Sequence, residues 1–293
     1  MKITQVAVIG LGRFGCSVAE QLTAYPEYRI YKIDTDIDER GSLAIGKLGD
    51  MSDFEAKIDM EDVEIYLRSI KKKDSVVLVL EGGDPISGCV LKVLESINHA
   101  SLSVLYIAPD RQMISETQKR DDRIAFNVLQ QYARSGMFET IFLVNKSQIE
   151  ELAGEVPIDK YEKTLSYFVA YVVAMINFFN HTDPILANKI SPNIISRVAT
   201  YGVSSLEDNS QEVSLLFPLE KSTDIHFFYG IPKPDLSEDS SLVKRIKNHV
   251  KQHKTDDISA SFSVYETTLD SVIVLCVAYS STVQEFATGQ NSL

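Results

Sequence analysis

The apolar residues in the first half of the chain form short continuous runs, and a segment with helical spacing follows most of them. Such runs are typical of strands that are buried on both faces of a sheet. The predicted strands are residues 6–9, 28–33, 75–80, 102–108 and 140–144, and the predicted helices are residues 18–22, 61–70, 89–97 and 124–134. This alternation predicts a parallel sheet covered by helices.

The second half of the chain has a different pattern. Residues 159–179 are predicted to form one long helix, and a helix that is apolar on more than one face is expected to be a central strut between domains. Its apolar residues include Leu165, Phe168, Val169, Val172, Val173 and Ile176. Beyond it, strands are predicted at residues 213–217, 225–229, 260–265 and 271–278, with a helix at 242–250. This arrangement indicates a smaller α+β domain.

These patterns predict an N-terminal domain of residues 1–158, a central helix of residues 159–182 and a C-terminal domain of residues 183–293. Two domains also fit the length of 293 residues, because single hydrophobic cores stop growing at roughly 250 to 300 residues. With 44% apolar and 24% charged residues, the chain has the composition of an ordinary globular protein and is expected to fold compactly.

The charge balance argues against several partners. The 29 basic and 41 acidic residues give a net charge of −12, and a field of that sign repels phosphate backbones and anionic lipids. Neither nucleic acid nor direct membrane insertion is therefore expected, and no uncharged apolar stretch reaches the roughly 18 residues needed to span a bilayer, because the closest, residues 165–179, is too short. Three widely separated cysteines, without a basic leader before the first apolar run, predict a cytoplasmic protein.

No metal site is expected from the histidines. His249 and His253 are four residues apart, as in some metal sites, but they lie in a lysine-rich run without a nearby cysteine or carboxylate cluster. We therefore expect both histidines on a solvated helix face.

A glycine-rich loop, Gly10-Leu-Gly12-Arg-Phe-Gly15, joins the first predicted strand to the first helix. Here glycines permit a tight turn and let backbone N–H groups approach a phosphate. Asp34 ends the next strand, where a Rossmann acid would bind ribose hydroxyls. Taken alone, the loop favours NAD(H) and resembles the nucleotide loop of the regulator-of-potassium-conductance domains. Alternatively, the glycines serve only the packing of strand against helix.

Further segments carry a resemblance that covers nearly the whole chain. They are Ile33-Asp34-Thr-Asp36, Leu80-Glu-Gly82-Gly83-Asp-Pro-Ile-Ser87-Gly88, Phe138-Glu-Thr-Ile-Phe-Leu-Val-Asn145, Phe227-Phe-Tyr-Gly230 and Ala260-Ser-Phe-Ser-Val-Tyr-Glu-Thr-Thr-Leu-Asp270. With them the chain resembles the FtsZ/tubulin superfamily, and the second segment is similar to the tubulin signature G-G-G-T-G-(S/T)-G. The resemblance implies an α/β fold with a Rossmann-like parallel-sheet N-terminal domain, a long central core helix and a smaller α+β C-terminal domain.

The resemblance also implies where a nucleotide would bind. The implied nucleotide-binding residues are Gly10, Gly12, Arg13, Gly15, Asp34, Gly82, Gly83, Ser87, Gly88 and Tyr161. Tyr161 is similar to the aromatic residue that stacks on guanine in the family, although Leu165 lies where the family has an asparagine that reads the base. GTP or GDP is the implied cofactor, and no other cofactor is expected.

The glycine-rich signature departs from the family pattern. Asp84 adds a negative charge that would face a phosphate, and Pro85 and Ile86 remove a backbone donor and the freedom of a glycine. These changes predict weakened phosphate binding.

The catalytic motif departs as well. The family completes GTP hydrolysis between subunits with N-x-D-x-x-(D/E), and Leu186, Asn188 and Ser191 lie at these three positions. Neither asparagine nor serine accepts a proton from water as a carboxylate does. In a shifted register Asp183 is the lone candidate acid, and its alternative role is that of a turn residue.

These departures predict an FtsZ/tubulin-like cytoskeletal or assembly protein with lost or much reduced GTPase activity. It would associate head to tail with itself, or bind a filament-forming FtsZ/tubulin relative. Two alternatives stay open. One is an active GTPase with divergent loops, and the other is a nucleotide-sensing regulator that binds a dinucleotide or a purine nucleotide at residues 10–15.

Overall fold

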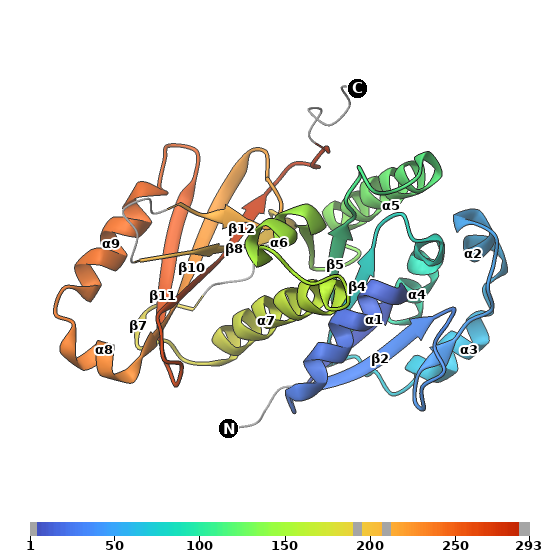
Figure 1. Ribbon diagram of the computed structural model, residues 1–293, viewed down its shortest axis with the longest axis horizontal. Coiled ribbons are helices and arrows are strands. Elements are labelled where there is room, and N and C mark those ends of the chain that lie inside the picture. The colour runs from blue at the N-terminus through green and yellow to red at the C-terminus, as the bar shows by residue number, and fades with distance from the viewer. Residues whose placement is uncertain (1–4, 190–194, 207–211, 287–293) are drawn as a thin grey trace. The chain divides into compact units, whose positions relative to one another are not determined.

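A computed structural model describes residues 5–189, 195–206 and 212–286. The chain forms two compact units, Met1–Tyr171 together with Glu285–Leu293, and Val172–Gln284. The division between them falls inside the long helix α7, Tyr161–His181. Each unit has its own set of strands and its own helices (Figure 1).

The first unit contains a parallel sheet whose described strands run in the order β3-β2-β1-β4-β5-β6. They are β1 (Val6–Leu11), β2 (Tyr28–Asp34), β3 (Leu43–Ala44), β4 (Ser75–Glu81), β5 (Ser101–Ala108) and β6 (Thr140–Asn145). Every residue of β1 is buried, because parallel strands are covered on both faces and so need continuous apolar runs. The predicted parallel sheet is confirmed.

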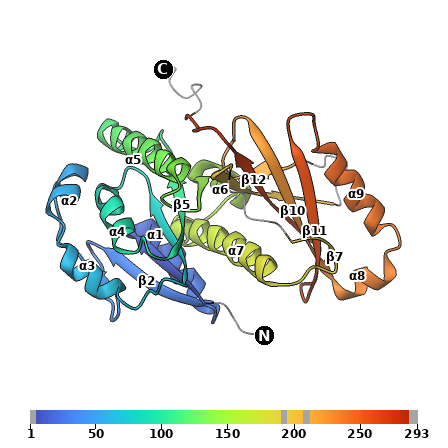
Figure 2. The same cartoon turned by 180° about the vertical axis from the view of Figure 1, so that it is seen from behind.

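Helices cover both faces of this sheet. They are α1 (Gly12–Gln21), α2 (Met51–Lys57), α3 (Met60–Leu67), α4 (Val90–Ser96), α5 (Glu116–Ser135) and α6 (Lys146–Ala153), with 3-10 turns at Leu22–Ala24 and Pro85–Cys89. Helix α1 lies on the face nearer the viewer in Figure 1, and α4 on the face nearer the viewer in Figure 2. The limits of α5 follow from its sequence. Ser115 and Gln118 form a capping box, and Gly136 ends the helix with a φ of 84°.

The second unit contains a mixed sheet with the described strands in the order β9-β8-β12-β10-β11-β7. They are β7 (Leu186–Ala187), β8 (Val198–Ser204), β9 (Ser214–Leu215), β10 (Ser222–Pro232), β11 (Ser259–Thr267) and β12 (Ile273–Ser280), accompanied by α8 (Lys233–Glu238) and α9 (Leu242–Gln252). Among the described strands of this sheet, β10 and β11 form the one parallel pair, and the other pairs are antiparallel. The predicted α+β character is confirmed, whereas β8 was not predicted.

One expectation for this unit was wrong. His249 does not lie on a solvated face, because it is fully buried between the hydroxyls of Tyr229 (2.7 Å) and Ser204 (2.9 Å). Burial lowers the pKa of His249 to about 4. The ring is therefore a neutral, hydrogen-bonded core residue.

Helix α7 is apolar along most of its length. Leu165, Val169 and Ile176 are buried, whereas Tyr167 and Phe178 are 55% and 44% exposed. Two aromatic side chains of this apolar helix are therefore open to solvent. No helix within the described residues has the length and apolar character needed to cross a bilayer.

Candidate functional site

The carboxyl ends of three neighbouring strands bring the predicted site residues together. Leu11 at the end of β1 pairs with Ile33 of β2 and with Leu80 of β4, so the chain leaves these strands at one edge of the sheet. In open parallel sheets, ligands bind outside this edge. The predicted residues gathered at or beside it are Gly10, Gly12, Arg13, Gly15, Asp34, Gly82 and Gly83.

Two glycines of the first loop are required by packing. A Cβ at Gly10 would lie 2.5 Å from the carbonyl oxygen of Gly15, and a Cβ at Gly15 would lie 2.4 Å from that of Val79. Side-chain carbons do not approach backbone that closely, so α1 contacts β1 and β4 only because these positions lack side chains. The packing role given above as an alternative is therefore present at both glycines.

The third glycine faces a carboxylate. Gly12 has a φ of +76°, and a Cβ built on it would lie 2.8 Å from Oδ2 of Asp84. The N-cap residue of α1, Leu11, provides no side-chain hydrogen bond to the first turn. The N–H groups at the start of this helix therefore depend on other partners, and the Asp84 carboxylate lies next to this positive dipole end.

Opposing effects act on this carboxylate. Burial raises the pKa of Asp84 most strongly, and the charge of Asp34 raises it further, whereas hydrogen bonds from the backbone N–H groups of Ile86 (3.2 Å) and Arg13 lower it. The net pKa shift is upward. Asp84 thus accepts backbone hydrogen bonds at a position where a phosphate oxygen would need them.

Ion pairs bind this edge of the unit together. Glu81 is largely buried, and it accepts a 2.8 Å bond from Lys146, whose Nζ also lies 4.4 Å from the centre of the Phe14 ring. Burial raises the pKa of Glu81 despite this partner. On the surface, Arg13 pairs with Glu162 at the start of α7. Sequence reasoning missed these groups, although a carboxylate closing the apolar run of β4 was a visible signal.

The second glycine loop contacts a buried polar network. A Cβ at Gly82 would lie 2.0 Å from the Tyr106 hydroxyl and 2.3 Å from Oδ1 of Asp122, so only glycine fits there. Asp122 has no exposed side-chain area and accepts hydrogen bonds from Tyr106 (2.6 Å) and Arg111 (2.8 Å). Gly83 follows with a φ of +75°.

Ser87 and Gly88 lie elsewhere. Both are buried, and a Cβ at Gly88 would lie 2.0 Å from the carbonyl oxygen of Met51, which starts α2. The Ser87 hydroxyl has no hydrogen-bond partner among the described residues. These two residues therefore lie beneath α2 and not on the open edge of the sheet.

Tyr161, the first residue of α7, is partly buried. Its hydroxyl donates to Glu150 at 3.0 Å, and burial, with Glu150 next in effect, raises the pKa of Tyr161 to about 12. The residue lines a shallow hollow that also contains Glu151 and Glu155. A negatively charged ligand entering this hollow would meet three glutamates.

In this arrangement the loops do not fit a triphosphate. The start of α1 already has a carboxylate of the chain itself as its anion, and Asp34, Glu81 and Glu162 add further negative charge around it. Arg13 and Lys146 oppose these charges directly, and each is already paired. A phosphate would have to displace Asp84 before it could receive the N–H groups of the helix.

The proposed catalytic positions belong to the second unit. Asp183 follows α7, is almost fully exposed and pairs with Lys189 at 2.8 Å, which lowers its pKa. A lower pKa makes the carboxylate a weaker proton acceptor. Leu186 lies in β7 and Asn188 just after it, both exposed, whereas Ser191 lies outside the described residues.

In the described part of the chain, no group of three histidine, cysteine or carboxylate side chains has a geometry that would hold a metal ion. The three cysteines are buried and not in disulfides.

No protein-family model matches this sequence, and comparison with curated protein sequences gives no match. Solved structures do match. An empty FtsZ dimer from M. jannaschii has a TM-score of 0.68 at 15% sequence identity, covering 94% of this chain and 88% of that chain. A GTPγS-form protofilament of TubZ from Bacillus thuringiensis serovar israelensis has a TM-score of 0.73 at 14% identity, with coverages of 96% and 88%.

A third similar structure is the GTPγS-bound protofilament of CetZ2 from Haloferax volcanii, with a TM-score of 0.67 at 14% identity and coverages of 94% and 92%. The chain thus has the FtsZ/tubulin-superfamily fold over most of its length, as its motifs predicted. At sequence identities this low, the similarity is evidence of the fold alone.

Proposed function

We propose that this chain is an FtsZ/tubulin-like assembly protein that has lost GTP hydrolysis and acts in the cytoplasm. It associates head to tail with its own copies, or it binds a filament-forming relative. Its structural neighbours include protofilaments, and a contact between two different patches of one chain propagates into filaments.

The observation that carries the loss of catalysis is the position of Asp84. A carboxylate against Gly12 supplies the helix start with an anion from within the chain. Asp183 supports the same conclusion, because its ion pair with Lys189 makes it a poorer base. Nucleotide-driven cycling would require an open phosphate position and a basic carboxylate, and the described residues at these positions favour neither.

The test begins with the purified protein. Bound nucleotide is extracted and identified, and light scattering and phosphate release are followed after addition of GTP. We expect no bound guanine nucleotide, no phosphate release, and scattering that depends on protein concentration but not on GTP. Scattering that rises together with phosphate release would refute the loss of hydrolysis.

A variant makes the role of Asp84 measurable. Asp84→Asn removes one negative charge next to the start of α1, and we expect it to bind inorganic pyrophosphate more tightly than the wild type. Asp36→Asn is the matched control, because Asp36 is exposed and pairs with Lys47. Equal pyrophosphate affinity in both variants would show that Asp84 does not control access.

A second candidate function is that of a nucleotide-binding protein, either a working GTPase that uses Asp183 or a nucleotide sensor. The favouring observation is that the glycines of residues 10–15 and Asp34 meet at one sheet edge, and a TubZ neighbour is a GTPγS form. Retained GDP or a retained dinucleotide in the purified protein would favour this candidate over the first.

A further inference from the structure

Helix α9 presents a row of lysines on the surface of the second unit. One side of the helix packs into the core of this unit through Leu242, Ile246 and Val250. The α9 lysine stripe consists of Lys244, Lys247, Lys251 and Lys254, all of them exposed. Their spacing of three and four residues places them along one side of the helix and its end.

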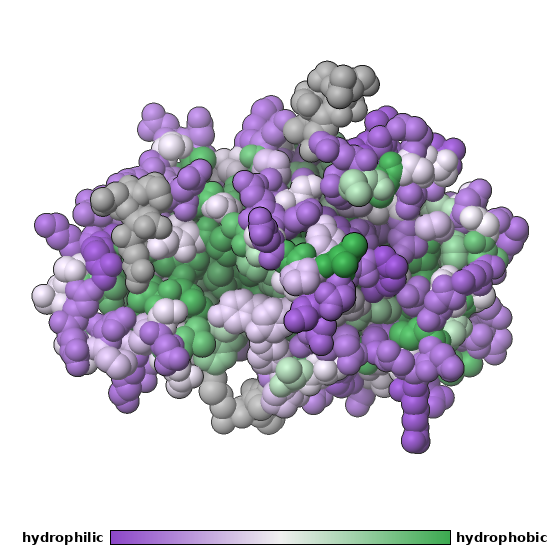
Figure 3. All heavy atoms as spheres, viewed as in Figure 1, coloured by the Kyte–Doolittle hydropathy of each residue, from purple (hydrophilic) through white to green (hydrophobic). Residues whose placement is uncertain are grey.

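This stripe has no electrostatic partner in the described part of the chain. Arg245 pairs with Asp239, but none of the four lysines takes part in an ion pair among the described residues. Residues 244–254 contain five basic residues and no acidic one, although the whole chain has a net charge of −12. In the space-filling view, the region that α9 occupies in Figure 1 is largely hydrophilic (Figure 3).

The first unit has the opposite charge concentrated in one segment. Residues 34–64 contain eleven acidic and three basic residues. The acidic α2–α3 surface consists of Glu55, Asp59, Glu61 and Asp62, which are exposed and form no ion pair among the described residues. The nearby Lys57 is already paired, at 2.5 Å, with Asp53.

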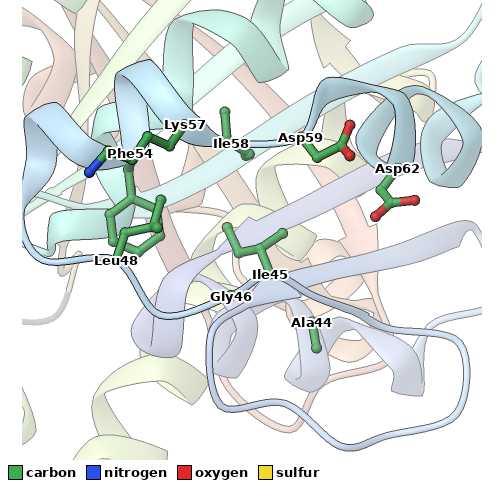
Figure 4. Close-up of a pocket in the computed structure, with 9 residues that line it drawn as sticks. All are labelled: Ala44, Ile45, Gly46, Leu48, Phe54, Lys57, Ile58, Asp59 and Asp62. Carbon is green, nitrogen blue, oxygen red and sulfur yellow. The ribbon is translucent and has the colours of Figure 1, made fainter.

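A hollow of about 190 Å³ lies beside these carboxylates. Apolar side chains, including Ile45, Phe54 and Ile58, line most of it, with Asp59 and Asp62 at one end and Lys57 beside Phe54 toward the other (Figure 4). A lysine side chain has the matching chemistry, because its four-carbon stem covers apolar surface while the ammonium group stays with the charges.

We propose that the α9 lysine stripe of one copy binds the acidic α2–α3 surface of another copy, with one lysine stem in the hollow beside Asp59 and Asp62. This inference rests on the proposed self-association and names the surfaces that would carry it. The two surfaces are different patches on different units. The contact is therefore heterologous and repeats from copy to copy.

Charge complementarity favours a second copy as the partner. At about 0.15 M salt, charges are screened beyond about 8 Å, so the local charges at a contact count for more than the net charge of the chain. The acidic surface is present at the same concentration as the lysine stripe, and its hollow fits a lysine. Anionic lipid and nucleic acid would also supply negative charges, as phosphates. They would not offer a lysine stem an apolar hollow such as the one on this chain.

The test uses charge reversal on each surface. Lys247→Glu with Lys251→Glu reverses the stripe, and Glu55→Lys with Asp62→Lys reverses the acidic surface. Asp59 stays unchanged because its side chain caps α3 through the N–H of Glu61. Lys72→Glu with Lys73→Glu is the matched control. These exposed lysines belong to the first unit and give the same change in charge as the reversal of the stripe.

Sedimentation velocity over a range of protein concentrations measures the association, with circular dichroism and thermal melting as checks of folding. We expect each reversed pair to weaken self-association at least about tenfold, the control to leave it unchanged, and an equimolar mixture of the two reversed proteins to associate again. Raising the salt concentration should weaken the wild-type association.

The outcomes separate this inference from the proposed function. A wild type that stays monomeric at every concentration overturns this inference together with the self-association on which it rests, and leaves binding to a filament-forming relative as the proposed function. A wild type that associates, with reversed variants that associate equally well, overturns only the surfaces named here. Lysine reversal that spares self-association but abolishes binding to phosphatidylglycerol vesicles or to double-stranded DNA also overturns the inference, and assigns the stripe to that polyanion.

Discussion

Asp122 provides a sharp test of the network behind the second glycine loop. Its carboxylate is completely buried, and burial raises its pKa from 3.8 to about 6, against the lowering effects of Tyr106 and Arg111. A carboxyl with a raised pKa in the folded state binds its proton more tightly there than in the unfolded chain. Its stabilising contribution is therefore complete below pH 3.8 and is lost as the pH rises through about 6.

The size of the effect follows from these two pKa values. Over the whole window the change amounts to about 3 kcal/mol, and between pH 7.5 and pH 5.0 it amounts to about 1.4 kcal/mol. We expect the free energy of unfolding of the wild type, relative to Asp122→Asn, to rise by about this amount as the pH falls from 7.5 to 5.0. The difference between the two proteins cancels the titration of the other groups.

Urea unfolding of both proteins at a series of pH values measures this difference. Arg111→Met serves as a second variant. It removes a charge that lowers the pKa of Asp122, and at neutral pH it should cost about 3 to 5 kcal/mol because a buried charge loses its partner. This cost should shrink at acidic pH. A wild-type minus Asp122→Asn difference that stays constant between pH 7.5 and 5.0 would refute the reasoning.

Three further predictions concern other parts of the first unit. Gly15→Ala should lower the melting temperature severely, because its Cβ would lie 2.4 Å from a carbonyl oxygen of β4, whereas Gly46→Ala, with no atom within 4 Å, should not. Lys146→Met should cost about 3 kcal/mol at pH 7 by leaving Glu81 buried without its partner, and this loss in urea unfolding should decrease toward acidic pH. Phe286→Ala should cost about 1 to 2 kcal/mol, since it removes a ring stacked at 4.2 Å on Phe126 and a cation–π contact with Arg111. Equal urea midpoints for Phe286→Ala and the wild type would contradict that last expectation.

The fold was predictable because its signals are local and repeated. Strands such as β1 are apolar at every position, and the glycines at positions 10 and 15 mark the close contact of α1 with β1 and β4. Strand β8 was missed. Its sequence, Val-Ala-Thr-Tyr-Gly-Val-Ser, mixes polar and apolar residues, and Gly202 interrupts it. A glycine within a strand weakens the sequence signal for that strand, even where close packing of neighbouring groups requires a glycine.

The site was harder to predict because its interactions join distant residues. The charge of Asp84 was visible in the sequence, but its place beside Gly12 depends on the pairing of β1 with β4. The partnership of Glu81 with Lys146 spans 65 residues. For Ser87, the motif predicted a phosphate contact, while the placement of α2 over it is a tertiary effect that no local pattern encodes.

The position of Asp84 has a consequence for how assembly would be controlled. In a polymer whose subunits hydrolyse GTP, the free energy of hydrolysis changes the strength of the contacts between subunits. A polymer without hydrolysis stays at equilibrium with its monomers. Its length then depends on protein concentration and on conditions that alter the contact itself. A contact made by the α9 lysine stripe and the acidic α2–α3 surface is sensitive to salt, because exposed charges are screened. Ionic strength would then regulate this chain as the nucleotide state regulates an active GTPase, and assembly should reverse fully when salt is raised and then removed by dialysis.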